Sequence, residues 1–530
     1  MSITGKLFID GAWIAGTAGT YHPHNPATGA PLSPAMTMAS SAQVDAALAA
    51  AAVAAPVFRN SSLQQRAEFL RLCADEIMAL GNELIVRVCE ETGYPAGRGE
   101  GERGRTCNQL RLFADTIMQG DYLDARIDTA LPDRLPAPRP DLRHLNQAIG
   151  PVVVFGASNF PLAFSVAGGD TAAAFAAGCP VLVKGHSSHP GTSELVAQAI
   201  ARALAKSGLP KGVFSLLMGS GAQVGAALVT APVVKAVGFT GSFAGGMALV
   251  ELANARPEPI PVFAEMGSIN PVILLPGALQ QKAQEIAKGF VGSLTQGTGQ
   301  FCVNPGLVIA IDDAALQDFM ATAANCIAQT PAGLMLNARI CSAYADGVKE
   351  YAKQAGVEII SSGAAAQSEQ GYYGRAILMA ATADCFLQNP RIHEEVFGPA
   401  ALIIKCKDKH DIVKVLDRLK GQLTATMHCS DGELAGYQDI VDLLSIKVGR
   451  IVVNGFPTGV EVCHAMVHGG PFPASTDSRF TSVGTNAIMR FVRPVCYQNF
   501  PENLLPAALR NSNPLGLLRL INGIKSKDKI

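Results

Sequence analysis

The sequence has almost no net charge and no secretion signal. Its 42 basic and 43 acidic residues leave a formal net charge of -1, so nucleic acid and anionic membranes find no electrostatic attraction. The amino terminus, MSITGKLFIDGAW, has no charged segment followed by a long apolar core, which a secretory leader requires. We therefore expect a cytoplasmic protein that acts on a small molecule, with neither a nucleic acid nor a membrane as its partner.

The 12 cysteines lack the spacing of a disulfide framework or a zinc motif. No Cys-x-x-Cys pair occurs, and no histidine stands at the spacing of a metal ligand. Scattered cysteines indicate free thiols in a reducing compartment. A free cysteine is more often a small buried apolar residue than a nucleophile, so a catalytic thiol has to be identified by its neighbours.

Long apolar runs are few. Residues 45–57 are rich in alanine but short for a membrane span. Residues 162–183 contain Gly168-Gly169-Asp170 and run into Cys179-Pro180, which predicts a buried helix followed by a buried strand. A length of 530 residues, of which 48% are hydrophobic, is enough for two or three domains with large cores.

Hydrophobic patterning predicts a helical part followed by two α/β parts. Residues 42–120 place apolar side chains at helical spacing. From residue 146 on, helical stretches alternate with short apolar runs, namely AIGPVVVFGAS, PVLVKGHSS, VFSLLMG, KAVGFTGS and PVILL. Strands that alternate with helices predict a parallel, doubly wound sheet, which binds a nucleotide at the carboxyl ends of its strands.

A second strand-and-helix block follows Glu265. It contains the runs GLVIAI, AALIIK and GRIVVN and a predicted helix at about 313–328. Two further strand-like segments, 123–148 and 489–500, are poorly suited to a core. Because they lie far apart in the sequence and both look exposed, we expect them to form an oligomerisation arm.

Cys302 is the strongest candidate for chemistry. The segment GQFCVNPG follows an apolar helical stretch and places this cysteine between glycines, as expected for a reactive thiol held on a turn. Asn159 follows the buried run VVVFGAS, where its amide either stabilises an oxyanion or is a simple turn residue. Glu265, 37 residues (302 − 265) before the cysteine, stands among apolar residues and glycine, which suits a general base or a structural ion-pair partner.

Three further motifs suit a bound nucleotide. Lys184 ends a strand, where it either contacts a ribose or phosphate or is simply solvated. Gly241 and Ser242 also end a strand, and their small size lets the backbone approach a pyrophosphate at a helix N-terminus. Glu395 precedes a rigid Phe-Gly-Pro turn, which fits ligand binding or a helix cap. A strict G-x-G-x-x-G is absent, so the standard Rossmann fingerprint is not present.

Taken in order, these motifs resemble the aldehyde dehydrogenase superfamily over nearly the whole chain. They are Asn-Phe-Pro, a lysine at a strand end, Phe-Thr-Gly-Ser, Glu-x-Gly, Gly-Gln-x-Cys and Glu-x-Phe-Gly-Pro. More narrowly, four segments are similar to the NADP-accepting branch that contains α-ketoglutaric semialdehyde (2,5-dioxovalerate) dehydrogenases and a bacterial fatty aldehyde dehydrogenase. These segments are GASNFPLAFSVAGGD, VKGHSSHPGTSE, GRTCNQLRLFAD and RFVRPVCYQNFPENLLP.

The resemblance implies an α/β fold with a Rossmann-like doubly wound cofactor domain, an α/β catalytic domain and a β oligomerisation arm. It also implies a homodimer or homotetramer. We expect a cofactor-binding domain at 1–122 and 149–264, a catalytic domain at 265–488, and an arm with the C-terminal tail at 123–148 and 489–530.

The resemblance also implies a role for each candidate catalytic residue. Cys302 would be the nucleophile that adds to an aldehyde and gives a thiohemiacetal. The side chain of Asn159 and the backbone N–H of Cys302 would hold its oxyanion. After hydride transfer to a nicotinamide, Glu265 would activate the water that hydrolyses the thioester.

For the cofactor, the resemblance assigns Lys184 to the adenosine ribose, Gly241 and Ser242 to the pyrophosphate, and Glu395 with Phe397 to the nicotinamide end. Ser187 stands where many NAD-preferring relatives have a glutamate that repels a 2′-phosphate. We therefore expect NADP as the cofactor, with NAD also possible. No arginine near Ser187 is evident that would make NADP use exclusive.

Substrate residues are harder to assign. Arg105 and Arg111 lie on one predicted helix and suit a distal carboxylate, although local ion pairs would explain them equally well. Phe160, Phe164 and Phe456 suit an apolar tunnel for a long-chain aldehyde, or a core. The segment HGGPFPAS departs from the Phe-Gly-Gly-x-Lys of many relatives, and we expect His464 and His468 to be structural or peripheral, with no metal bound.

Four functions remain open at this point. The first is oxidation of α-ketoglutaric semialdehyde to 2-oxoglutarate, and the second is oxidation of aliphatic or fatty aldehydes in general. A third is a non-catalytic relative that keeps the fold. The last is a thiol esterase or a CoA-dependent acyl transferase, which would share the thioester intermediate.

Overall fold

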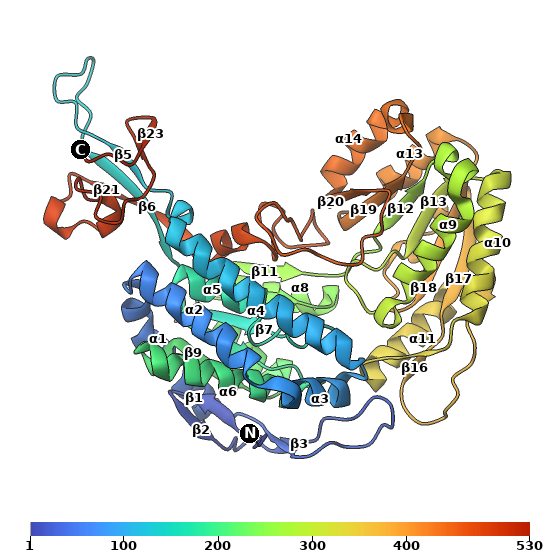
Figure 1. Ribbon diagram of the computed structural model, residues 1–530, viewed down its shortest axis with the longest axis horizontal. Coiled ribbons are helices and arrows are strands. Elements are labelled where there is room, and N and C mark those ends of the chain that lie inside the picture. Colours follow the sequence, from blue (N-terminus) through green and yellow to red (C-terminus); the bar gives the residue numbers. More distant parts are fainter. Residues whose placement is uncertain (1) are drawn as a thin grey trace.

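The computed structural model of the chain describes residues 2–530. Two α/β bodies lie side by side, and a small β arm projects from the far end of the first body (Figure 1). Each body is built on a seven-stranded sheet, and the arm has a sheet of its own.

The first sheet has the strand order β11-β10-β7-β8-β9-β1-β2, and the five strands from β11 to β9 are parallel. Its strands are β1 (Leu7–Ile9), β2 (Ala12–Ile14), β7 (Val152–Phe155), β8 (Val181–Lys184), β9 (Phe214–Leu217), β10 (Ala236–Thr240) and β11 (Val262–Glu265). The run VVVF of β7 is buried throughout, as expected for a parallel strand that is covered on both faces.

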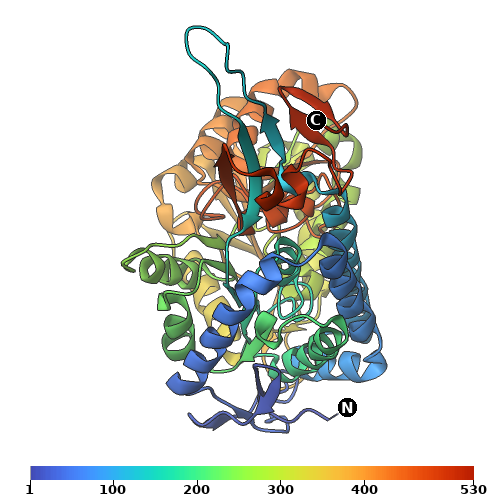
Figure 2. The ribbon, with the colours of Figure 1, turned by 90° about the vertical axis from the view of Figure 1, so that its left-hand side faces the viewer.

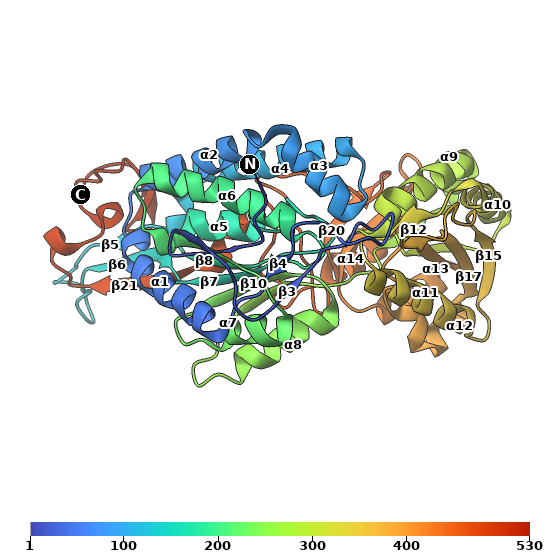
Figure 3. The same ribbon diagram turned by 90° about the horizontal axis from the view of Figure 1, so that it is seen from below.

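Helices cover both faces of this sheet (Figure 3). One layer contains α2 (Leu63–Met78), α3 (Gly81–Thr92), α4 (Ala96–Gln119), α5 (Gly169–Ala177) and α6 (Pro190–Ser207). The other contains α1 (Ser41–Arg59), α7 (Ala226–Thr230) and α8 (Phe243–Asn254). The apolar stretch 162–183 thus ends in the buried helix α5 and the buried strand β8, as predicted.

Within residues 2–530, α1 is the one helix long and apolar enough to cross a membrane by length and composition. Core helices of soluble proteins pass the same test. One face of α1, with Val44, Leu48 and Phe58, is buried, and the helix packs against β1, β8 and β9. Packing on the sheet therefore accounts for the apolar residues on this buried face.

The second sheet has the order β15-β17-β18-β13-β12-β19-β20, and β15 is the antiparallel strand at its edge. Its strands are β12 (Pro271–Leu274), β13 (Leu307–Ile311), β15 (Glu358–Ser362), β17 (Ile377–Thr382), β18 (Ala400–Cys406), β19 (Gln422–His428) and β20 (Val448–Val453). The alternation of side chains divides its core in two: Val272 and Leu274 join one hydrophobic cluster, while Ile273 joins the other.

Helices cover both faces of this sheet too. The helices α9 (Pro276–Thr295) and α10 (Ala314–Gln329) contribute to the first of these clusters. The second cluster is filled by side chains of α11 (Ala338–Ala352), α12 (Ala383–Gln388), α13 (Lys409–Arg418) and α14 (Gln438–Lys447). Two small ribbons complete the bodies: β3 (Thr20–Tyr21) with β4 (Met36–Thr37), and β14 (Gly333–Leu334) with β16 (Tyr373–Gly374). The helix predicted at about 313–328 is α10, so that prediction is confirmed.

The arm joins segments that lie far apart in the sequence, and Figure 2 shows it projecting above the first body. Its sheet has the order β21-β6-β5-β22-β23. Its strands are β5 (Arg126–Asp128), β6 (Leu142–Ala148), β21 (Val492–Gln498), β22 (Arg519–Ile521) and β23 (Ile524–Ser526). Strands β6 and β21 pair antiparallel along their whole length.

Two strands near Glu265 differ from the prediction. The run PVILL, which we expected to be a strand of the first sheet, forms β12 in the second sheet. The edge strand β11 had not been predicted, because its sequence VFAE is short and ends in a carboxylate. Glu265 therefore ends a strand of the first sheet, six residues before the second sheet begins at Pro271.

The segment after β20 crosses back from the second body to the first (Figure 1). It adds an antiparallel bridge between Ser475 and Glu265, and the backbone of Met266 donates to the carbonyl of Ala474. The segment therefore brings residues from 460 to 485 against the end of β11. It completes a site to which both sheets contribute.

Candidate active site

The three candidate catalytic residues all lie in or next to loops at the carboxyl ends of secondary-structure elements. Glu265 is the last residue of β11, and Asn159 lies in the loop after β7. Cys302 lies in the loop between α9 and β13. The side chains of Asn159 and Glu265 are buried, and that of Cys302 is partly exposed. Such a position suits a reactive thiol that a substrate can reach.

The loop before Cys302 needs its glycines. Gly297, Thr298 and Gly299 all have positive φ, at 55°, 58° and 64°. A Cβ on Gly299 would lie 2.3 Å from the backbone carbon of Gly398, which leaves no room for a side chain. The loop that carries the thiol is therefore fixed directly against the Phe-Gly-Pro turn that follows Glu395.

Two asparagines hold the other side of this loop. The Nδ2 of Asn270 donates to the carbonyls of Cys302 and Asn304, at 2.9 Å and 3.0 Å. Nδ2 of Asn304 donates in turn to the carbonyl of Gly398, at 3.0 Å. These bonds orient the Cys302 peptide, yet no motif in the sequence marked Asn270.

The thiol of Cys302 lies in surroundings that disfavour its ionised form. Burial raises its pKa well above 9, and the carboxylates of Glu265 and Glu395 raise it further, while Arg105 lowers it. The thiol is therefore neutral at rest, and it has to give up its proton before it can attack a carbonyl carbon.

Glu265 has the properties of a general base. Its pKa is raised to about 7, mainly by burial, with Ser482 acting in the opposite direction. The hydroxyl of Ser482 donates to Oε2, while the buried Oε1 accepts no hydrogen bond within residues 2–530. Ser482 thus holds one oxygen, while the other lies 3.2 Å from Nε2 of His468 and can take a proton from water.

Asn159 is held through its backbone. Its carbonyl accepts hydrogen bonds from the hydroxyl of Tyr94, at 3.1 Å, and from the guanidinium of Arg98, at 3.2 Å. Its side-chain Nδ2 donates to the carbonyl of Gln300, two residues before the thiol, at 2.9 Å. The amide therefore already points at the loop of Cys302, and a substrate oxyanion would compete with Gln300 for it.

His468 corrects one sequence expectation. It was expected to be structural or peripheral, but it is buried, with its Nε2 3.3 Å from Sγ of Cys302 and 3.2 Å from Oε1 of Glu265. Burial is the main cause that lowers its pKa to about 3, so the imidazole is neutral. The departure of HGGPFPAS from the usual family segment was the signal in the sequence. His464 lies four residues before His468 and contacts the hydroxyl of Thr485.

The predicted cofactor residues lie at the ends of β8, β10 and the Phe-Gly-Pro segment. Lys184 ends β8, and burial lowers its pKa. No ion pair of Lys184 occurs in the described part of the chain, so its ammonium is available to a ligand. Ser242 is the N-cap of α8, and its neighbours in the first turn are exposed. The exposed helix N-terminus can therefore accept a pyrophosphate.

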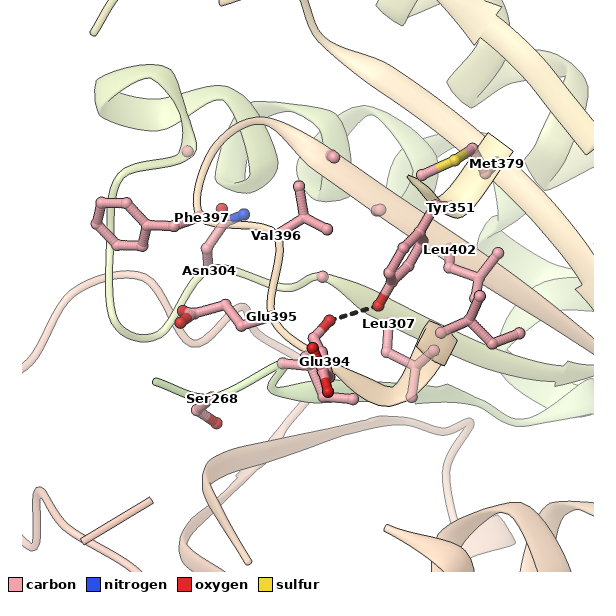
Figure 4. A pocket seen from close by; sticks show the side chains of 16 residues that line it. Ser268, Asn304, Leu307, Tyr351, Met379, Glu394, Glu395, Val396, Phe397 and Leu402 are labelled. Carbon is pink, nitrogen blue, oxygen red and sulfur yellow. Dashed lines mark hydrogen bonds between the residues drawn. The ribbon is translucent and has the colours of Figure 1, made fainter. Parts of the chain in front are cut away.

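Glu395 and Phe397 line a pocket beside the thiol loop, together with Ser268, Gly299 and Asn304. Both side chains extend away from Tyr351, whose hydroxyl donates to the carbonyl of Glu394 (Figure 4). Burial raises the pKa of Glu395 to about 8. The backbone of Ser268 donates to this carboxylate and partly offsets the effect of burial, and a ribose hydroxyl would give it a second polar partner.

Gly241 and Gly267 allow neighbouring side chains to pack directly against the backbone at the same edge. A Cβ on Gly267 would lie 2.1 Å from the carboxylate of Glu395, and one on Gly241 would lie 2.7 Å from the ring of Phe239. Ser187, three residues after Lys184, is exposed. These groups fit a nicotinamide dinucleotide, because they supply a cation, a helix N-terminus and a carboxylate at successive strand ends.

The two arginines on α4 lie in different environments. Arg105 stacks over Phe164 at 5.1 Å, and its buried Nη1 has no hydrogen-bond partner in the part of the chain that the structure describes. Burial lowers its pKa, against the attraction of Glu102, Cys302 and Glu265. Arg111 instead lies at the surface, where it pairs with Asp75 at 2.8 Å. Of the two, the structure brings only Arg105 to the thiol.

The phenylalanines that were candidates for the substrate site also lie in two different places. Phe160 packs edge-on against Phe164 and Phe301, with ring centroids 5.3 Å apart in both cases, so it lies beside the thiol loop. Phe456 packs instead against Phe290 of α9 and against His428. Phe160 is therefore next to the site, whereas Phe456 mainly extends the core of the second body.

Arg450 on β20 was missed in the sequence. Its guanidinium donates to the carbonyls of Pro457 and Gly459, at 2.6 Å and 3.1 Å. It interacts electrostatically with Cys302. A second cation thus faces the thiol from the second body, and nothing in GRIVVN distinguished it from a surface arginine.

Comparison with known proteins agrees with this geometry. The model of the aldehyde dehydrogenase family matches residues 13–490. The chain is 53% identical over 524 residues to alpha-ketoglutaric semialdehyde dehydrogenase 2 of Azospirillum brasilense, and the match covers 99% of each chain. It is 46% identical over 530 residues to alpha-ketoglutaric semialdehyde dehydrogenase of Acinetobacter baylyi, again with 99% of each chain covered.

Solved structures share the fold. One is 3,6-anhydro-L-galactose dehydrogenase in complex with NAP, at a TM-score of 0.80 and 22% identity over 93% of this chain and 99% of that one. Another is a mutant of aldehyde dehydrogenase C from Pseudomonas syringae, at a TM-score of 0.79 and 23% identity over 94% of this chain and 97% of that one. The expected α/β fold is thus confirmed, and the chain belongs to the aldehyde dehydrogenase family, whose members oxidise aldehydes with NAD(P).

Proposed function

We propose that this chain oxidises α-ketoglutaric semialdehyde to 2-oxoglutarate, with NADP as the preferred oxidant and NAD as an alternative. Two relatives that carry this name are 53% and 46% identical to it over nearly their whole length. The observation that carries the proposal is the buried Nη1 of Arg105, which has no hydrogen-bond partner among residues 2–530. Arg105 interacts electrostatically with both Cys302 and Glu265. The distal carboxylate of an oxo-acid aldehyde would supply that partner.

The chemistry follows from the positions of the side chains. Sγ of Cys302, once deprotonated, adds to the aldehyde carbon, and the oxygen of the thiohemiacetal is stabilised by Asn159 and by the Cys302 backbone N–H. A bound nicotinamide would supply the hydride acceptor, and loss of hydride from the thiohemiacetal would leave a thioester on Cys302. Glu265 then removes a proton from water through its free Oε1, and the carboxylic acid and the thiol are released.

A substrate panel tests the proposal. We expect kcat/KM for α-ketoglutaric semialdehyde to exceed that for hexanal by more than about tenfold, or ~1.4 kcal/mol in the transition state. A preference of the same size for hexanal would contradict the proposal. It would support the second candidate, a dehydrogenase of aliphatic aldehydes, which the apolar rings of Phe160 and Phe164 beside the thiol favour. The same reactions run with and without CoA should give only the free acid.

Replacing Arg105 with alanine should lower kcat/KM much more for α-ketoglutaric semialdehyde than for hexanal. A charge-assisted hydrogen bond is worth about 1.5–3 kcal/mol, so kcat/KM for the semialdehyde should fall by about 10- to 150-fold. The value for hexanal should fall less, because hexanal has no carboxylate for Arg105 to bind and loses only the effect of Arg105 on the Cys302 thiol. The matched control is Arg111→Ala on the same helix, which removes only an exposed ion pair with Asp75. An equal loss for both aldehydes would contradict the assignment.

Ser187→Glu tests the choice of cofactor. Ser187 is exposed three residues after Lys184, so a carboxylate there would face the 2′-phosphate of NADP. We expect kcat/KM for NADP to fall by more than about tenfold through like-charge repulsion, while the value for NAD is kept or rises. The neighbouring Ser188→Ala, which loses a hydrogen bond to Asn337, serves as the control for local disturbance. An unchanged ratio of NADP to NAD use would show that Ser187 does not contact this phosphate.

A further inference from the structure

We propose that Cys302, His468 and Glu265 form a binding site for one Zn²⁺ or a similar divalent transition metal, and that the bound metal reversibly inhibits the enzyme. The three ligand atoms, Sγ, Nε2 and a carboxylate oxygen, all lie within 4.8 Å of one another. Each comes from a different segment of the chain: the loop after α9, the segment that crosses back between the bodies, and the end of β11. Only the folded site therefore brings them together.

The distances suit a tetrahedral ion. Zn²⁺ binds sulfur at about 2.3 Å, nitrogen at about 2.0–2.1 Å and oxygen at about 2.0–2.2 Å, so neighbouring ligand atoms lie about 3.3–3.6 Å apart. In this structure Nε2 of His468 is 3.3 Å from Sγ of Cys302 and 3.2 Å from Oε1 of Glu265. Both distances are close to the spacings of a tetrahedral ion, and Sγ of Cys302 lies within 4.8 Å of the carboxylate oxygen of Glu265.

The three side chains also offer free ligand atoms. Oε1 of Glu265 is buried and accepts no hydrogen bond in the described part of the chain, while Oε2 is held by Ser482. A ligating carboxylate needs such a partner on its other oxygen to keep its orientation. The imidazole is 2% exposed and neutral, which is the form that binds a metal. A thiolate, a carboxylate and a neutral imidazole would neutralise the two charges of the ion without another anion.

Binding would stop catalysis without changing the oxidation state of any atom. As the metal–sulfur bond forms, the S–H bond of Cys302 breaks and its proton goes to solvent. The sulfur lone pair that would attack the aldehyde is then engaged, and Glu265 loses its free oxygen. A fourth position remains for water, as in three-ligand zinc sites. Removal of the metal by a chelator returns the thiol unchanged.

Metal binding to the enzyme without cofactor or aldehyde tests the site directly. Calorimetric titration with Zn²⁺ should give one strong site per chain. Titration with Co²⁺ as a probe should give the sulfur-to-cobalt charge-transfer band and the intense visible bands of tetrahedral cobalt. Cys302→Ser should remove the sulfur band, and His468→Phe, which keeps a ring against Phe164, should weaken Zn²⁺ binding by about 100-fold.

Inhibition provides a second, independent measurement. Micromolar Zn²⁺ should inhibit the enzyme, EDTA should restore full activity, and His468→Phe should need at least tenfold more Zn²⁺ for the same fractional inhibition. The matched control is Cys496→Ser, which removes an exposed thiol on the arm and should leave both activity and metal binding unchanged. The proposal is overturned if His468→Phe binds Zn²⁺ with unchanged affinity, if cobalt shows no sulfur band, or if Cys496→Ser abolishes binding. Melting curves of each variant show whether it is folded.

Discussion

Cys302→Ala should lose aldehyde oxidation completely, because the proposed mechanism needs the thiol of Cys302 to form the covalent bond to the aldehyde carbon. Removal of the nucleophile from an enzyme of this kind costs on the order of 10⁶-fold in kcat. The measurement is the formation of NADPH with α-ketoglutaric semialdehyde, in the steady state and in the first turnover. The substitution removes one sulfur from a partly exposed position, so the melting temperature and the binding of NADP should be kept.

The other cysteines provide the control for this result. Cys496 is exposed on β21 of the arm, and Cys341 is partly buried on α11. Alanine at either position should leave kcat within about twofold, as expected for substitutions away from the site. If Cys302→Ala formed NADPH at the wild-type rate, the covalent mechanism would be wrong, even though the chain belongs to the aldehyde dehydrogenase family.

Much of the arrangement of the candidate site could be predicted because these residues stand in short motifs at the ends of predicted elements. Asn159, Lys184 and Glu265 all follow or end buried runs, and the carboxyl ends of parallel strands meet at one edge of a sheet. A local pattern is therefore enough to place these residues. Their order along the chain then identifies the family.

His468 could not be placed in this way. It is 166 residues from Cys302 in the sequence, and it reaches the thiol because the segment after β20 crosses between the bodies and pairs with the end of β11. Such a crossing follows from the docking of two domains, and no local propensity encodes it. Arg450 was not predicted for a related reason, because the sequence of its strand β20 does not differ from that of an ordinary edge strand.

The two arginines of α4 illustrate a different limit. Arg105 and Arg111 are six residues apart, so at about 100° per residue their side chains are separated by about 240° around the helix. They therefore point to different surroundings, one to Phe164 and the other to Asp75 at the surface. The sequence shows that the two arginines lie on different faces of the helix, but it does not show which face lies toward the thiol.

Glu265→Gln should leave acylation largely intact and slow the release of product. The amide is nearly the same size as the carboxylate and can still contact Ser482, but it cannot accept a proton from water. Loss of a general base typically costs about 10²–10⁴-fold, so the steady-state kcat should fall by about that factor. The thioester on Cys302 should accumulate.

A rapid-mixing experiment distinguishes this outcome from general damage. The variant should form about one NADPH per active site in a fast burst, followed by a slow phase, because hydride transfer precedes hydrolysis. Hydroxylamine, which attacks thioesters without a base, should speed up the slow phase. Glu394→Gln is the matched control. The side chain of Glu394 is exposed, it precedes Glu395 in the chain, and the proposed mechanism gives it no role. Absence of a burst, with equal loss of the first turnover and the steady state, would mean that Glu265 acts before the thioester forms. Its buried position 3.2 Å from His468, which in turn contacts the thiol, would then assign it to thiol deprotonation.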